Sequence, residues 1–157
     1  MTEELSKSYI FIDICIHNKF AMDEAFILQG IVKWSHDYEM QSVGDTQKVM
    51  ASMANFIPPL HHHSGSIALS RAKLIIEGFE NDEDLAIPLS AMKQIYIGFD
   101  YTFPKSSSRS LGFFWQPLRI EYYISSLETS FVYLIIDYNG IRSNNKLWFN
   151  TLIQILE

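Results

Sequence analysis

The chain has 157 residues, of which 48% are hydrophobic and 19% charged, a balance that excludes a disordered tail and indicates one globular domain over residues 1–157. Its formal net charge of -6 argues against a nucleic-acid partner, because a generic binder needs a basic field to displace counterions from phosphate. Cys15 is the only cysteine, so no internal disulfide can form, and a reducing, cytoplasmic compartment is expected.

The first part of the chain shows both strand and helix patterns. Residues 9–17 alternate in polarity with a period of two, which predicts a strand, and residues 26–34 predict a second one. Gly30 interrupts the second pattern and is expected to mark a bulge or bend. Residues 45–57 change to helical spacing and end before two prolines, which predicts a helix.

The rest of the chain is rich in predicted strands and ends in a helix. Short runs of β-branched and aromatic residues separated by polar turns predict strands at 66–70, 72–79, 85–89, 94–101, 117–124 and 131–137. The last of these is apolar on both faces and is expected to lie centrally. Asn144 is expected to cap a C-terminal helix whose apolar stripe includes Trp148, Leu152 and Ile155.

Three segments resemble the pleckstrin-homology-like (PH-like) superfold, and within it the GRAM and bacterial PH-like families. They are residues 66–78 (SIALSRAKLIIEG), 87–95 (IPLSAMKQI) and 145–152 (NKLWFNTL). The resemblance covers about residues 24–157 and implies a mainly β fold. Its form would be a seven-stranded, partly open barrel of two packed antiparallel sheets, capped by a C-terminal helix with Trp148 in the core. The strand at 9–17 and the helix at 45–57 are additions to that pattern.

The resemblance implies a non-enzymatic interaction module, since PH-like folds bind phosphoinositides, phosphopeptides or proteins. The sequence contains neither a G-x-S-x-G elbow nor a glycine-rich phosphate loop. Asp13, Cys15 and His17 share one face of a predicted strand, but a thiol in an apolar strand is usually an inert packing group. We therefore expect no enzymatic activity and no cofactor.

A protein or peptide partner is the favoured ligand, bound by strand addition at a sheet edge or in the groove beside the C-terminal helix. The alternative is a peripheral lipid-binding domain that uses the loop 104–115, with basic residues facing anionic headgroups and aromatic residues at the interface. Against a phosphoinositide site, the connection 35–65 has only Lys48 as a fixed positive charge. Both hypotheses use the same candidate surface: Lys105, Arg109, Phe113, Phe114 and Trp115.

The run His61-His62-His63 suggests a second alternative, metal binding. In an extended chain His61 and His63 would share a face and could reach one ion, with a third ligand from Asp37, Glu39 or His36. The competing interpretation is an exposed polar loop, because no zinc-type spacing accompanies the run.

Self-association is a further expectation. The predicted strand at 9–17 lies outside the seven-strand pattern and would leave backbone groups open unless it paired with a sheet edge. A homodimer formed through residues 9–17 would satisfy them.

Overall fold

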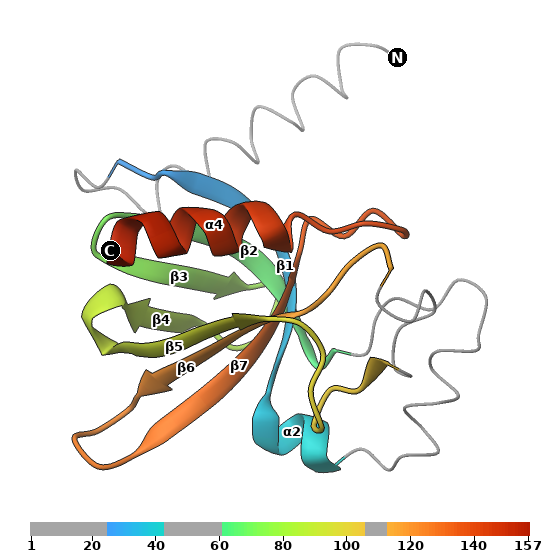
Figure 1. The fold of residues 1–157 in the computed structure, drawn as a ribbon, viewed down its shortest axis with the longest axis horizontal. Coiled ribbons are helices and arrows are strands. Elements are labelled where there is room, and N and C mark those ends of the chain that lie inside the picture. The colour runs from blue at the N-terminus through green and yellow to red at the C-terminus, as the bar shows by residue number, and fades with distance from the viewer. Residues whose placement is uncertain (1–24, 43–60, 106–112) are drawn as a thin grey trace.

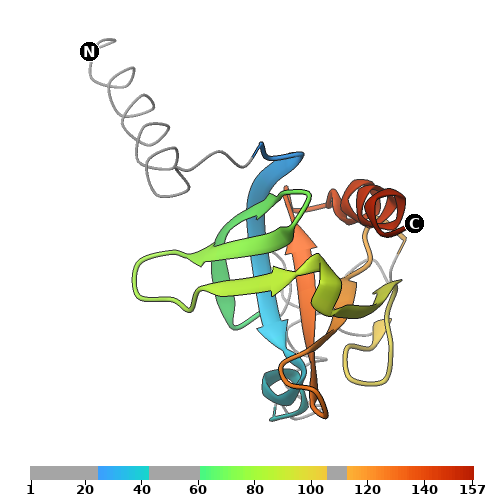
Figure 2. The same cartoon turned by 90° about the vertical axis from the view of Figure 1, so that its left-hand side faces the viewer.

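The computed structural model describes residues 25–42, 61–105 and 113–157. Within these ranges, seven strands form one antiparallel sheet in the order β4-β3-β2-β1-β7-β6-β5. Helix α4 (Asn145–Leu156) lies on one face of the sheet, and the short helix α2 (Asp37–Ser42) lies at the other end of the molecule (Figures 1 and 2). Neither helix in these ranges combines the length and apolar character needed to cross a membrane.

The seven strands predicted from residue 26 onward are all present, with ends that differ by up to a few residues. They are β1 (Leu28–His36), β2 (His63–Leu69), β3 (Lys73–Gly78), β4 (Leu85–Pro88), β5 (Met92–Ile97), β6 (Leu118–Tyr123) and β7 (Thr129–Ile136). A short 3-10 helix, η1 (Leu89–Ala91), joins β4 to β5. The predicted strand at 9–17 and helix at 45–57 lie outside the described residues, and α2 was not predicted.

The mainly β class with a C-terminal helix is confirmed, but the expected barrel of two packed sheets is wrong. β1 pairs with β2 on one side and with β7 on the other, so the strands belong to one hydrogen-bonded sheet. Among the described residues, β4 and β5 are its two edges, and the sheet does not close into a barrel. Pro88 has no amide hydrogen to donate and η1 follows it directly, so the chain turns between the two edge strands without pairing them.

The main hydrophobic core, here called the inner core, lies between the sheet and α4. Alternate residues of β1, β2, β3, β6 and β7 point into it, joined by Ile87 of β4 and by α4. Trp148 is 1% exposed, Leu152 is buried, and Ile155 packs against the same core at its margin. The apolar stripe of the C-terminal helix therefore faces the sheet.

A second hydrophobic cluster, here called the outer cluster, lies on the other face of β7. It consists of Met40, Phe103, Trp115, Tyr133 and Ile135. Because the strand alternates, Leu134 and its alternate neighbours enter the inner core while Tyr133 and Ile135 enter the outer cluster. β7 is thus buried on both faces and lies between β1 and β6, in the central position that its composition predicts.

Two local expectations are wrong, and both involve the carboxylate of Asp137. The register of β1 against β2 runs without a shift through Gly30, so there is no bulge there. A Cβ at Gly30 would lie 2.6 Å from Asp137 Oδ1, and that oxygen accepts a hydrogen bond from Ile31 N at 2.9 Å. A side chain at this position would therefore displace the carboxylate from its bond to Ile31 N. Asn144 makes no side-chain cap for α4, and its side-chain amide donates to Asp137 Oδ2 at 2.9 Å.

Candidate functional site

A pocket of about 260 Å³ lies where the end of β5, the segment 113–116 and the start of α4 meet. Apolar and polar side chains share its wall about equally, and one lysine is among the polar ones. Its lining includes Ile97, Phe113, Phe114, Trp115, Gln116 and Lys146. The pocket carries no carboxylate, imidazole or thiol in its lining, and Lys146 is its only ionisable side chain among the described residues.

Asn145 holds three parts of this pocket together. Its side chain is almost completely buried, and its Oδ1 accepts a hydrogen bond from Ile136 N at 2.8 Å. Its Nδ2 donates to Gln116 O at 2.6 Å and to Leu134 O at 2.9 Å. The start of α4, strand β7 and the segment before β6 are therefore fixed relative to one another, which gives this pocket a rigid frame. Sequence reasoning missed Asn145, because a single asparagine at a helix start gives no signal of long-range contacts.

Only some residues of the candidate surface predicted from the sequence are exposed in the structure. Phe113 is 85% exposed and Phe114 is 56% exposed, while Lys105 is also exposed. Trp115 is only 6% exposed, so its assignment to the surface is corrected. Its ring packs against Phe99 and the Tyr138 ring, which makes it a wall of the pocket rather than a projecting anchor. Arg109 lies outside the described residues.

The open edge of β5 runs up to this pocket. Within the described residues β5 pairs only with β6, and α4 contacts β5. Gly98 N donates to Pro117 O at 3.0 Å, so the backbone groups at Gly98 point toward β6. Because successive residues of a strand direct their backbone groups to opposite sides, Ile97 and Ile95 direct theirs toward the open edge. An added strand could therefore pair with β5 and end in the pocket.

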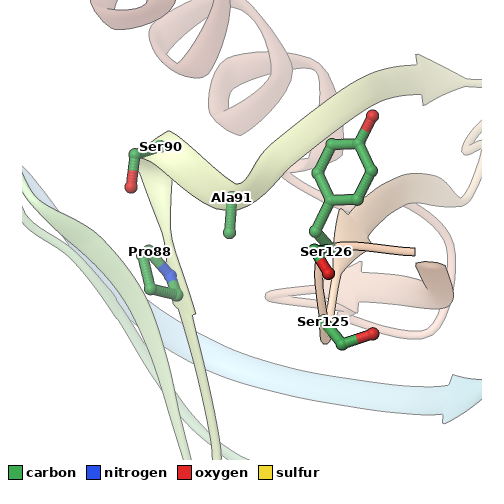
Figure 3. Close-up of a pocket in the computed structure, with 6 residues that line it drawn as sticks. Pro88, Ser90, Ala91, Ser125 and Ser126 are labelled. Carbon is green, nitrogen blue, oxygen red and sulfur yellow. The ribbon is translucent and has the colours of Figure 1, made fainter. Parts of the chain in front are cut away.

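A second, more open pocket of about 410 Å³ lies between η1 and the turn after β6. Pro88, Ser90 and Ala91 lie on one side, and Ser125 and Ser126 lie on the other (Figure 3). Tyr123 completes the lining, which contains hydroxyl groups but no histidine or carboxylate. A serine hydroxyl without a neighbouring base is a weak nucleophile, so this pocket gives no support to catalysis.

The structure places His63 between two carboxylates instead of around an ion. His63 Nε2 lies 2.6 Å from Glu39 Oε1, and Nδ1 lies 2.5 Å from Asp82 Oδ1. The two carboxylates occupy opposite sides of the ring, whereas metal ligands must converge on one point. His62 turns to the Ser35 hydroxyl at 2.8 Å. In the described ranges no group of three or more His, Cys, Asp or Glu side chains has the arrangement of a metal site.

The charge on His63 follows from these contacts. Burial opposes ionisation of the ring, but the hydrogen bonds to Asp82 and Glu39 outweigh it and raise the pKa of His63 above its usual 6.5. The same contact, together with hydrogen bonds from Ser64 N and Glu83 N, lowers the pKa of Asp82 against the opposing effect of burial. Near neutral pH this arrangement favours an imidazolium between two carboxylates.

No protein-family model matches the chain, and a search of curated proteins found none similar to it. The resemblance to PH-like domains therefore depends on the three sequence segments alone.

Proposed function

We propose that this chain is a non-enzymatic, PH-like interaction module that binds an extended segment of a partner protein along the open edge of β5. The main support for the proposal is that the edge of β5 ends at a pocket lined by Phe113 and Phe114. The order of the seven strands and a C-terminal helix with Trp148 in the core are compatible with the PH-like assignment.

Backbone and side-chain contacts have separate roles in this mode of binding. The N–H and C=O groups of Ile95 and Ile97 supply hydrogen bonds that do not depend on the partner's sequence. The pocket supplies selectivity, because burying an exposed phenylalanine stabilises a complex by about 2 kcal/mol. Lys146 at the pocket margin favours a partner with an acidic side chain beside an apolar one.

A displayed library of random peptides, selected on the full chain, tests the proposal with a defined probe. We expect enriched peptides to be apolar and β-forming, and to bind Phe113→Ser at least about tenfold more weakly. Ile97→Pro should also weaken binding, because it removes an N–H that faces the open edge. The variant should still fold, since proline is tolerated at a sheet edge. Leu127→Ser is the matched control, because Leu127 is an exposed apolar residue in the turn between β6 and β7. Leu127→Ser should bind like the wild type. The proposal is contradicted if Phe113→Ser and Ile97→Pro also bind the peptides as tightly as the wild type does.

Two other partners are distinguished by separate measurements. Binding of the wild type to phosphatidylserine vesicles, lost in Lys105→Glu, would support a peripheral lipid-binding domain in place of the peptide-binding module. Sedimentation of the chain with and without residues 9–17 tests the homodimer expected from that segment. If the chain sediments as a monomer both with and without residues 9–17, the homodimer is contradicted. That result does not bear on peptide binding, which the library selection tests.

A further inference from the structure

The side chains of Glu39, His63 and Asp82, here called the histidine clamp, join three elements that are distant in the sequence. His63 is the first residue of β2, Glu39 belongs to α2, and Asp82 lies in the turn between β3 and β4. The imidazole also stacks on Trp34 of β1, with ring centroids 4.5 Å apart. This stacking fixes the ring plane, so the two nitrogens face their carboxylates in a defined orientation.

Each carboxylate of the clamp also accepts a hydrogen bond from a backbone amide: Glu39 within its own segment, and Asp82 from β2. Glu39 Oε2 accepts a hydrogen bond from His36 N at 2.7 Å, the reciprocal contact of a capping box at the start of α2. Asp82 Oδ2 accepts one from Ser64 N at 2.7 Å. The next residue of α2, Met40, is completely buried in the outer cluster. The position of α2 therefore depends on two neighbouring residues: Glu39, which belongs to the clamp, and Met40, which packs in the outer cluster.

The proton count on the imidazole decides whether both contacts can form. A neutral imidazole has one N–H donor and one bare nitrogen, whereas an imidazolium has two donors. Ionised carboxylates only accept hydrogen bonds. Loss of one proton from His63 therefore leaves either Glu39 or Asp82 opposite a nitrogen lone pair.

We propose that His63 is a proton-controlled clamp, which holds α2 and the turn between β3 and β4 against the sheet when charged and releases one of them when neutral. The release uncovers the side of the outer cluster that Met40 covers. The inference is independent of the proposed binding function, because it concerns only contacts within the chain.

The groups around the clamp are predominantly acidic. His36 lies near His63, with ring centroids 6.2 Å apart, and its Nε2 is 3.6 Å from Glu83 Oε2. Further titratable groups in this part of the described chain are Lys33, Asp37, Tyr38, His62 and Tyr122. Burial and nearby carboxylates raise the pKa of Tyr38, so its phenol is neutral when His63 titrates.

The direction of the pH effect follows from these groups. The pKa of His63 is raised in the folded chain, so its stabilising contribution is complete below about 6.5 and is lost as the pH rises through the folded value. The pKa of Asp82 is lowered, so this carboxylate loses its charge only at acidic pH. Between the pKa of Asp82 and the pKa of His63 the clamp is therefore closed, and it opens when the pH rises above the pKa of His63.

A pH titration of the full chain by NMR tests the clamp. We expect the His63 ring to titrate above 6.5 and the backbone amides of α2 to shift with the same midpoint. His63→Gln should abolish the shift of the α2 amides. His62→Gln is the matched control, since His62 is the neighbouring histidine but contacts Ser35, and it should keep the wild-type midpoint.

A further variant keeps the test decisive if His63→Gln does not fold. Glu39→Gln preserves hydrogen bonding to His36 N but removes one charge, so it should lower the midpoints of His63 and of α2 together. The inference is overturned if the His63 midpoint lies at or below 6.5, or if the α2 amides do not follow the His63 ring.

Discussion

The inner core and the outer cluster are built in different ways, although they share β7. The inner core is largely aliphatic and comes from regular alternation on the strands, with α4 laid across it. The outer cluster is mostly aromatic and comes largely from outside the strands: Met40 from α2, and Phe103 and Trp115 from the connections flanking residues 106–112. Regular periodicity thus creates one core, and irregular segments that fold back onto the sheet create the other.

A polar network also distinguishes the outer cluster. The Asp100 carboxylate accepts hydrogen bonds from Phe103 N at 2.8 Å, Arg119 Nη1 at 2.9 Å and the Tyr133 hydroxyl at 2.9 Å. Arg119 in turn lies over the Tyr96 ring, 5.1 Å from its centroid. These bonds fix the segment after β5 on the outer face, where no regular backbone ladder does so.

The largest expected effect is in the inner core. Trp148→Ala removes a side chain that is 1% exposed between α4 and the sheet. We expect a loss of about 4 kcal/mol in the free energy of unfolding, because the sheet cannot collapse into the cavity. Leu147→Ala, at a position 53% exposed on the same helix, should cost less than about 1 kcal/mol. Urea denaturation measures both, and equal losses would contradict the packing of α4 described above.

An intermediate effect is expected in the outer cluster. Phe103→Ala removes contacts with the rings of Phe99, Trp115 and Tyr133. The loss should be about 3 kcal/mol, below that of Trp148→Ala, because an irregular segment can relax into part of the cavity. Tyr101→Ala is the control, since Tyr101 lies on the same segment and is exposed. A loss for Phe103→Ala larger than that for Trp148→Ala would reverse the ranking of the two clusters.

The smallest effect concerns the polar network. Tyr133→Phe removes one hydrogen bond to Asp100 and should cost about 1 kcal/mol near pH 7. Burial and the contact with Asp100 raise the pKa of Tyr133 above its usual 10.0, so the folded chain keeps this phenol neutral when the unfolded chain ionises it. The contribution of Tyr133 is therefore complete below 10.0 and falls above it, and the variant should become relatively more stable there. A difference between wild type and variant that stays constant across this range would contradict the shifted pKa.

The strand pattern made much of the fold predictable. Alternation located the seven strands and the helix with Trp148, and it placed β7 centrally because both of its faces are apolar. The single open sheet was not predictable from that pattern, since alternation says which face is buried but not which strands pair. The same reasoning explains why Gly30 was expected to mark a bulge: the pattern contains no sign that Asp137 approaches it from across the sheet.

The candidate site was less predictable than the fold. Phe113 and Phe114 were found by their aromatic character, but Trp115 was misplaced on the surface because its partners Phe99 and Tyr138 come from other segments. His63 was expected to hold a metal ion or lie in a loop, and the strand that begins there was predicted three residues late. Glu39 was among the candidate third ligands for that ion, and it does lie beside His63, but as a hydrogen-bond partner. Asp82 was not expected there, because it reaches His63 only through a tertiary contact that composition and spacing do not contain.

The pairing of β1 with both β2 and β7 has a consequence for synthesis on the ribosome. Once β4 has emerged, β1 to β4 can already assemble, but the β7 side of β1 stays open until residues 129–136 follow. During that interval the nascent chain presents an unpaired strand edge, a situation that promotes association between chains. Translation speed over the second half of the message, and the availability of chaperones, should therefore affect the yield of folded protein more than they would for a sheet built from neighbouring hairpins alone.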